Sequence, residues 1–204
     1  MIRIFIIVIL FIVSLSSNET IKQYKELARK GDIKANFELG KIYFNGKIVK
    51  QDLDTAMKYF NRASIYGDQK ALYNIATIYA QKKYSDFSLR KSYNLFLDLA
   101  QKGNPKAQNK IGLFLLHGIG VDKDYKLSVR WFEQSYFKGN YKPAACNLSL
   151  MYASGKGVFP NFGRARELAE IGLKEKIATC VKTYKDFNLQ KYEKDKGFKY
   201  GFYK

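Results

Sequence analysis

Histidine and cysteine are scarce in this chain, which has one His and two Cys among 204 residues. A Ser-His-Asp triad or a histidine-based zinc site would need His117 to act alone or with distant partners. No Cys-x-x-Cys pair and no phosphate loop of the form G-x-x-x-x-G-K-S/T occurs in the sequence. We therefore expect no metal site and no cofactor.

Acidic residues are also few, since 36 Lys and Arg stand against 18 Asp and Glu, leaving a net charge of +18. The basic residues are spread along the whole chain rather than gathered in one arm. Such a field attracts polyanions in general, including nucleic acid, anionic lipid, lipopolysaccharide and acidic proteins. The available partner depends on where the protein is located.

A long hydrophobic run is missing as well. Arg3 is followed by an apolar run over residues 4–13 and then by serines, which predicts a cleaved signal peptide over residues 1–17. A stable transmembrane span needs about 20 apolar residues. No Cys follows the run, so a lipoprotein anchor is not supported. We expect a periplasmic or secreted protein, with an uncleaved inner-membrane anchor as the alternative, and export argues against nucleic acid as partner.

The two cysteines are Cys146 and Cys180. An even number of cysteines in an exported chain favours a disulfide. The alternative is two buried free thiols, because Cys also behaves as a small hydrophobic residue.

Glycine has a regular spacing that is typical of a repeat array. Four glycines recur at intervals of 36 residues, and each copy between them has the pattern of a helix, a loop and a second helix. Residues 19–30 and 177–187 predict a capping helix at each end. We expect an all-α repeat domain over residues 18–187, with a basic aromatic tail over 188–204 that is disordered, loosely docked or a binding segment. The glycines are Gly31, Gly67, Gly103 and Gly139, and the copies span 31–66, 67–102, 103–138 and 139–175, the last with one extra residue.

The loop inside each copy carries helix-ending and helix-starting signals. Glycine adopts the left-handed conformation that ends a helix without steric cost, and Asp or Asn accepts hydrogen bonds from the free backbone N–H groups of the next helix. Copy two has no glycine in its loop, QKKYSDFSL, so we expect local irregularity there. The predicted helix ends are Gly46, Gly118 and Gly155, and the predicted N-caps are Asp52, Asp124 and Asn161.

In-register residues of copies one, three and four resemble the Sel-one-like repeat family, relatives of the tetratricopeptide repeats. The resemblance implies an α/α solenoid, wound as a right-handed superhelix, whose first helices line the concave face. It also implies an exported adaptor that binds proteins. In copy one the resemblance is carried by Ala35, Leu39, Gly40, Tyr43, Gly46, Val49, Asp52, Ala56, Tyr59 and Phe60.

A cysteine-rich subset of that family has been associated with penicillin binding and is sometimes labelled β-lactamase. Cys146 resembles the first-helix cysteine of this subset, but the partner cysteine that the subset places shortly upstream is absent. Ser88 and Lys91 match the Ser-x-x-Lys motif of serine β-lactamases, although the companion motifs are not present. These two residues are the catalytic candidates, and the alternative interpretation is a solvated helix start with Ser88 as its cap.

Specificity should lie on first-helix positions that face away from the core, because repeat packing does not dictate them. We expect a protein partner at these positions; the alternatives are that neighbouring helices bury them, or that the chain binds anionic envelope polymers by charge. The candidate binding residues are Phe37, Lys41, Phe44, Tyr73, Thr77, Asn109, Leu113 and Leu150.

Overall fold

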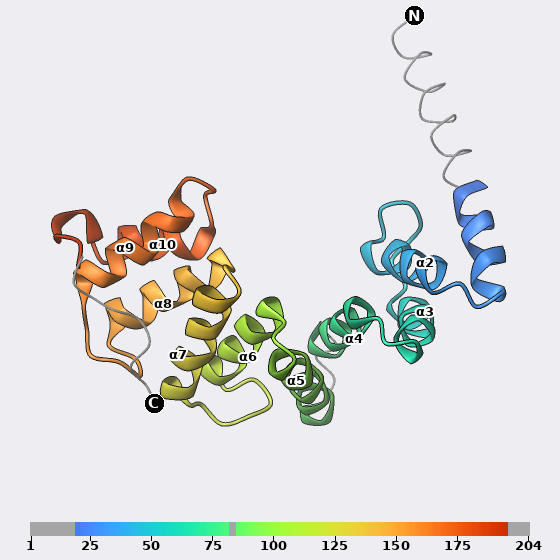
Figure 1. The fold of residues 1–204 in the computed structure, drawn as a ribbon, viewed down its shortest axis with the longest axis horizontal. Helices are drawn as coiled ribbons and strands as arrows, with labels where there is room; N and C mark the ends of the chain where they lie inside the picture. Colours follow the sequence, from blue (N-terminus) through green and yellow to red (C-terminus); the bar gives the residue numbers. More distant parts are fainter. Residues whose placement is uncertain (1–18, 82–84, 196–204) are drawn as a thin grey trace, which may run out of the picture. The chain divides into compact units, whose positions relative to one another are not determined.

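The computed structural model describes residues 19–81 and 85–195, and all regular secondary structure in these stretches is helical (Figure 1). The chain divides into two compact units, Met1–Tyr84 and Ser85–Lys204, called unit 1 and unit 2 below. Within each unit, consecutive helices pack as pairs. The predicted all-α fold of helix pairs is therefore confirmed, while the predicted signal peptide over residues 1–17 lies outside the described residues.

Unit 1 contains helical residues 19–29. They are followed by α2 (Ile33–Asn45), α3 (Leu53–Ile65) and α4 (Gln69–Gln81). α3 packs against both α2 and α4. Ile21 and Ala28 are buried in one cluster with Ala35 and Leu39 of α2. The helix over residues 19–29 thus covers the apolar face of α2.

Unit 2 contains α5 (Asp86–Gln101), α6 (Pro105–His117), α7 (Tyr125–Glu133), α8 (Lys142–Ser154), α9 (Phe162–Leu173) and α10 (Ala178–Asp186). Two short helices, η1 (Gln134–Lys138) and η2 (Leu189–Lys191), follow α7 and α10. α6 packs against α7, and α8 packs against α9. The main core of this unit lies around α8, where Leu148 and Met151 are fully buried together with Phe132 of α7 and Leu168 of α9.

The predicted helix ends and starts are confirmed. Gly46, Gly118 and Gly155 have φ of 65°, 72° and 67°, and each N–H bonds to a carbonyl of the preceding helix. The N-cap side chains are Asp52 at α3, Asp124 at α7 and Asn161 at α9. At Asp52, hydrogen bonds from the hydroxyl and the backbone N–H of Thr55 lower the pKa of the carboxyl group.

Small residues on the first helices allow aromatic rings of the second helices to approach closely. A Cβ added at Gly40 would lie 2.5 Å from the ring of Phe60, and one added at Gly112 would lie 2.5 Å from the ring of Phe132. In copy four a serine occupies this position, and the hydroxyl of Ser149 donates to the carbonyl oxygen of Ala165 at 2.7 Å. The paired helices therefore approach closely at this position in copies one, three and four.

The extra residue between copies three and four is accommodated by η1, a π-helical turn that continues α7. A π-helix bonds residue i to i+5 and so takes up one residue more per turn than an α-helix. At the end of α5 the left-handed residue is Gly103, with φ 85°, whereas here Gly139 has φ −101° and Asn140 has φ 49°. The left-handed conformation therefore falls one residue later here than at the end of α5. α8 begins two residues after Asn140, as α6 begins two residues after Gly103.

The loop of copy two departs from the other loops, as expected. Ser85, not Ser88, is the N-cap of α5, because its Oγ accepts a hydrogen bond from the N–H of Ser88 at 3.2 Å. The prediction of Ser88 as the cap is wrong, since the helix begins at Asp86, closer to the start of the loop. The boundary between the two units falls in this loop, and residues 82–84 lie outside the described residues.

The predicted disulfide is present in the structure. Cys146 of α8 and Cys180 of α10 are bonded, with Cα atoms 4.6 Å apart, and both residues are fully buried. Gly172 of α9 lies directly beside them, because a Cβ there would stand 2.6 Å from Sγ of Cys180 and 2.7 Å from Sγ of Cys146. The bond therefore joins α8 and α10 at a point where α9 also passes.

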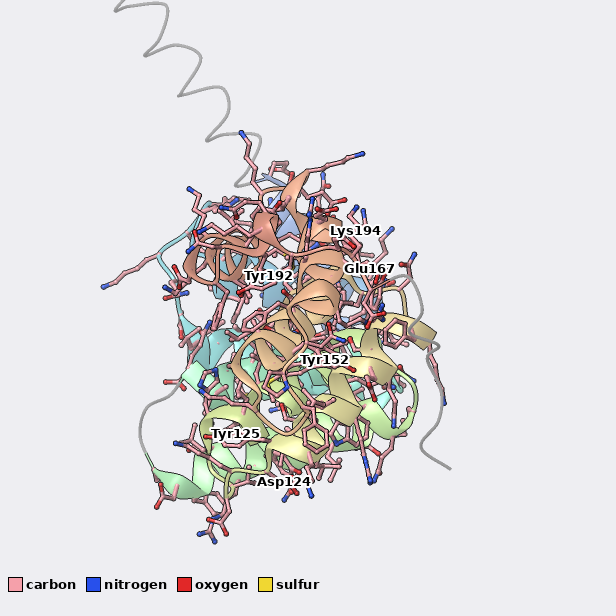
Figure 2. All side chains as sticks on the ribbon, turned by 90° about the vertical axis from the view of Figure 1, so that its left-hand side faces the viewer. Asp124, Tyr125, Tyr152, Glu167, Tyr192 and Lys194 are labelled. Carbon is pink, nitrogen blue, oxygen red and sulfur yellow. A yellow bond between two sulfur atoms is a disulfide. The ribbon has the colours of Figure 1, made fainter. Side chains whose placement is uncertain are left out.

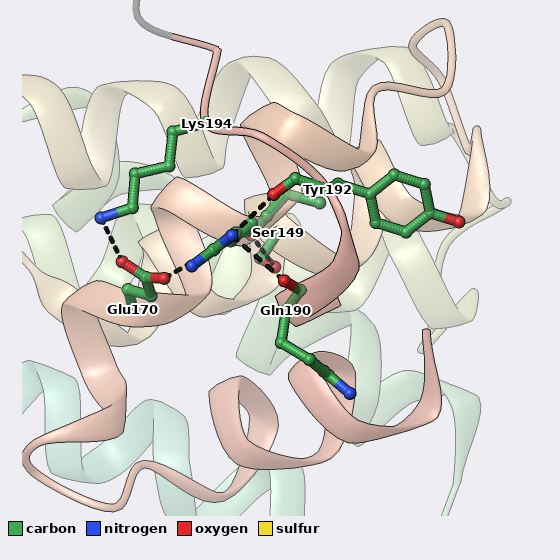
Figure 3. A network of polar contacts seen from close by, with 7 residues as sticks. Ser149, Glu170, Gln190, Tyr192 and Lys194 are labelled. Atoms are coloured by element: carbon green, nitrogen blue, oxygen red, sulfur yellow. Dashed lines mark hydrogen bonds and ion pairs between the residues drawn. The ribbon is translucent and has the colours of Figure 1, made fainter. Parts of the chain in front are cut away.

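Residues 188–195 pack against α9 rather than forming a loose tail. Leu189 is fully buried, and the ring of Tyr192 stacks on Phe162 with centroids 4.5 Å apart. Arg166 donates to the backbone carbonyl of Tyr192 at 2.7 Å and pairs with Glu170, which also pairs with Lys194 (Figure 3). The expectation of a loose tail is wrong for residues 188–195, and residues 196–204 lie outside the described residues.

Candidate functional site

The candidate aromatic residues of α2 lie against the second helix of their own pair. The rings of Phe37 and Phe44 have their centroids 5.8 and 6.3 Å from that of Phe60 on α3, and both side chains are half-buried. Lys41 pairs with Glu38 at 2.8 Å, and its Nζ lies 5.5 Å from the centroid of the Phe37 ring. α2 thus brings three of the predicted residues together on one half-exposed face.

The candidates on α4 are also half-buried. The hydroxyl of Thr77 donates to the backbone carbonyl of Tyr73 at 2.9 Å, one turn earlier in the helix. This bond satisfies the hydroxyl within the helix. Tyr73 and Thr77 therefore share a face of α4.

The candidates in unit 2 contribute more to packing. Asn109 is 6% exposed, and its Oδ1 accepts a hydrogen bond from Nδ2 of Asn147 at 2.8 Å. Leu113 is half-buried against the main core, and Leu150 is half-buried on α8. The Asn109–Asn147 bond joins α6 to α8, so this amide has little surface left for a partner.

The catalytic candidates Ser88 and Lys91 lie in the first two turns of α5. Ser88 is half-buried, with its Oγ 3.4 Å from Oγ of Ser85, and Lys91 is exposed. His117 is exposed at the last position of α6. Within residues 19–81 and 85–195, no group of three His, Cys, Asp or Glu side chains is placed to hold a metal ion.

A groove in unit 2 involves residues that the sequence analysis did not select. It has a volume of about 610 Å³ and lies between α7 and the loop that joins α8 to α9. We call it the Phe159 groove, after the exposed aromatic residue in its lining. Its lining residues are Lys126, Val129, Arg130, Gly155, Gly157, Val158, Phe159 and Pro160.

Two glycines shape the loop that lies against the start of α7. Gly157 has φ 74°, and a Cβ there would stand 2.4 Å from the carbonyl oxygen of Tyr125. Gly155 has φ 67°, and a Cβ there would stand 2.8 Å from Pro160. Lys156, between them, holds its Nζ 5.7 Å from the centroid of the Tyr125 ring. Asp124 and Tyr125 at the start of α7 are labelled in Figure 2.

The sequence did contain a signal for this groove, namely a difference between copies. Phe159 stands where copy three has Asp122 and copy one has Lys50. The contact between the loop and the preceding second helix is shared, since a Cβ at Gly120 of copy three would stand 2.7 Å from Leu89 of α5. An aromatic residue at this loop position distinguishes copy four from both other glycine-containing copies.

A buried cation lies in the same unit, on α9. The side chain of Arg164 is 1% exposed and pairs with Glu167 at 2.7 Å. Burial lowers the pKa of Arg164, and the charge of Glu167 opposes this shift. Burial raises the pKa of Glu133 on α7, although the charges of Arg164 and Arg130 act in the opposite direction. This arrangement provides a structural ion pair.

No helix among the described residues is long and apolar enough to cross a membrane.

The pairs of helices match a known protein family. A family model described as Sel1 repeat matches residues 33–65, 105–140 and 142–174, which together make up half of the chain. The matched ranges correspond to copies one, three and four. Copy two, whose loop lacks glycine and contains the boundary between the units, lies outside them.

Two curated relatives and one solved structure extend this comparison. The chitin synthase regulator SKT5 of Saccharomyces cerevisiae is 28% identical over 127 residues, which cover 61% of this chain and 18% of that protein. Protein sel-1 homolog 2 of Homo sapiens is 32% identical over 124 residues, which cover 59% of this chain and 18% of that protein. The chain thus spans about a fifth of the length of these relatives.

The solved structure is that of c5321, described as a protective antigen present in uropathogenic Escherichia coli strains and displaying an SLR fold. The TM-score is 0.73 at 23% sequence identity, over 83% of this chain and 36% of that chain. At this identity the likeness concerns the fold alone.

Proposed function

The chain belongs to the Sel1 repeat family, and we propose that it is an exported, non-enzymatic scaffold that binds a protein partner through half-exposed faces of its first helices. The observation that carries this proposal is the face of α2 formed by Phe37, Lys41 and Phe44, which the packing of the pair covers only in part. Aromatic residues are enriched at protein interfaces. The face of α4 with Tyr73 and Thr77 has the same half-exposed character.

The family relationship supports binding rather than catalysis. The yeast relative is described as a regulator of chitin synthase, which is a role exerted on another protein. Repeat arrays bury their conserved positions in the core and leave variable positions on extended binding surfaces. The partner of this chain is then chosen by residues that differ from copy to copy.

Export is supported by the disulfide between Cys146 and Cys180. Disulfides persist in oxidising compartments and are rare where thiols are kept reduced. The apolar run over residues 4–13 is consistent with this location, and the proposed place of action is the periplasm or the outside of the cell.

The test is crosslinking and pull-down from the native envelope with the wild-type chain and with Phe37→Ala and Tyr73→Ala. We expect both substitutions to reduce recovery of the partner, because each removes an aromatic ring from a first-helix face. Tyr66→Ala is the matched control, since Tyr66 is 63% exposed at the end of α3, a second helix. Thermal unfolding of each variant checks that the fold is retained.

Two results would contradict the proposal. One is unchanged recovery of every partner with both variants. The other is binding that collapses with rising salt, because attraction by net charge alone is screened, as for an anionic envelope polymer, whereas a packed protein interface survives moderate salt.

A further inference from the structure

We propose that the Phe159 groove binds an acidic segment of a partner protein that carries an apolar side chain. This inference deepens the proposed scaffold function and rests on it, since it names the class of partner at one surface. It concerns residues on α7 and the loop between α8 and α9, which are separate from the first-helix faces of α2 and α4.

The apolar half of the groove is formed by the loop. Phe159 is 94% exposed, which is unusual for a ring that would gain free energy by leaving water. Val158 and Pro160 flank it, and Val129, 2% exposed, lies at the base. An apolar side chain of a partner that enters the groove would cover the exposed ring of Phe159.

The basic half is formed by α7. Lys126 and Arg130 both line the groove, and residues four apart lie on the same side of a helix. Lys156 adds a third positive charge next to the lining glycines, over the Tyr125 ring. No acidic side chain is among the lining residues.

The acidic groups nearest to these cations in sequence have other roles. Asp124 accepts the hydrogen bond from the N–H of Leu127 as the N-cap of α7. Glu133 interacts with the charges of Arg164 and Arg130. The charged side chains that line the groove are therefore those of Lys126 and Arg130, and the groove complements negative charge.

The groove is formed before any partner arrives. Gly157 allows the loop to lie on the backbone of Tyr125 and Lys126, with less space than a Cβ would need. A site that is already ordered loses less conformational entropy when it binds. A volume of about 610 Å³ is within the usual range of ligand sites and admits one or two side chains with adjoining backbone.

Charge and apolar surface together select the occupant. A plain polyanion would satisfy the cations but would leave Phe159 exposed, and a plain apolar segment would leave Lys126 without a partner. An acidic segment with an apolar residue satisfies both halves of the groove.

The test is fluorescence anisotropy with a fluorescein-labelled peptide, EDEFEDLDE, titrated with the full chain at moderate salt. We expect saturable binding that Phe159→Ala weakens about tenfold or more, since one well-buried anchor contributes at least that factor in many interfaces. Lys126→Glu should weaken binding by a similar factor. Both residues are exposed, and an acidic residue in the first turn of a helix is favourable to folding, so both variants should fold.

Matched substitutions outside the groove provide the controls. Phe87→Ala removes another exposed ring, 71% exposed on α5, and Lys106→Glu reverses a charge in the first turn of α6. The backbone carbonyl of Pro105, next to Lys106, accepts a hydrogen bond from Ser135 of η1, and neither Lys106 nor Phe87 lines the groove. Both control variants should bind the peptide like the wild type.

Three results would overturn the inference: no binding of EDEFEDLDE by the wild type, equal binding by Phe159→Ala, or equal binding of the peptide EDESEDSDE, which keeps the charge and lacks the apolar side chains. Each of these leaves the first-helix proposal standing if the native partner is still lost with Phe37→Ala and Tyr73→Ala. If every variant still recovers the native partner while peptide binding depends on the groove, the first-helix proposal alone is overturned.

Discussion

The ring of Phe132 occupies the space that a side chain on residue 112 would need. In copy four a larger first-helix residue, Ser149, occurs together with Ala169 at the position of Phe132. Both residues of each pair are fully buried or nearly so. The two positions therefore exchange volume between copies, so that a small residue on one helix accompanies a large one on the other.

This exchange predicts an energetic coupling between residues 112 and 132. Gly112→Ala should destabilise the chain by about 1–3 kcal/mol through overpacking, and Phe132→Ala by about 3–5 kcal/mol through the cavity. The double variant should lose about 1–3 kcal/mol less than the sum, because the new methyl group enters the space that the ring has left. Urea unfolding of the wild type and the three variants measures the coupling.

Gly103→Ala serves as the control for that cycle. It strains a backbone with φ 85°, but a Cβ there has no neighbour within 4 Å. Its effect should add to that of Phe132→Ala. If the effects of Gly112→Ala and Phe132→Ala were also additive, the Phe132 ring would not be the reason that residue 112 is a glycine.

The partly buried carboxylate of Glu133 predicts a pH-dependent contribution to stability. Because burial raises its pKa in the folded state, the folded chain binds this proton more readily than the unfolded chain does. Ionised Glu133 therefore costs stability above its folded pKa, and this cost disappears as the pH falls through that value and then through the unfolded value near 4.5.

Glu133→Gln removes that cost. At pH 7 we expect its free energy of unfolding to be equal to or higher than that of the wild type, and the difference should shrink below about pH 4, where both side chains are neutral. Urea unfolding at both pH values checks this. A variant clearly less stable than the wild type at pH 7 would show that the attraction to Arg164 and Arg130 outweighs desolvation.

At the scale of helices, the disulfide determines how the last helix is held. α10 has two buried residues, Cys180 and Thr183, and its covalent bond to α8 adds to the packing of half-buried Tyr184 on the core. Gly172 makes the bond possible, because any side chain on α9 at this point would meet both sulfur atoms. The disulfide thus depends on three residues from three helices.

Replacing both cysteines by Ala should lower the free energy of unfolding by roughly 3–4 kcal/mol, the loop entropy for this separation. The bonded residues are 34 positions apart. Hydrogen exchange by mass spectrometry should show faster exchange in α10 and η2, with little change in α2 and α3 of unit 1. Unchanged stability would mean that helix packing alone holds α10.

At the scale of the whole molecule, the sequence predicted one repeat domain with local irregularity in the loop of copy two, and the structure contains two compact units. The all-α class, the copies, the three glycine ends and three N-caps were predictable because each depends on local chemistry at a fixed spacing. The missing glycine in copy two was also visible, and the unit boundary lies in that loop.

The Phe159 groove and the docking of residues 188–195 could not be predicted in the same way. The groove depends on which α7 residues lie opposite the loop, and this follows from a close backbone approach at Gly157. The docking of Tyr192 depends on the half-buried ring of Phe162 on α9. Both features arise from contacts between elements, which the repeat pattern does not specify, although the aromatic residue at position 159 marks copy four in the sequence.

The π turn at residues 134–138 shows how such a chain tolerates a change in length. One residue inserted in an α-helix would rotate every later side chain by about 100° and move the buried face out of position. Here the insertion is confined to a single turn, and Asn140 takes over the left-handed conformation held by glycine in the other copies. Genes for such proteins can therefore gain a codon inside a helix as well as in a loop and still encode a continuous core. Copies of the repeat in one chain then need not be equally spaced.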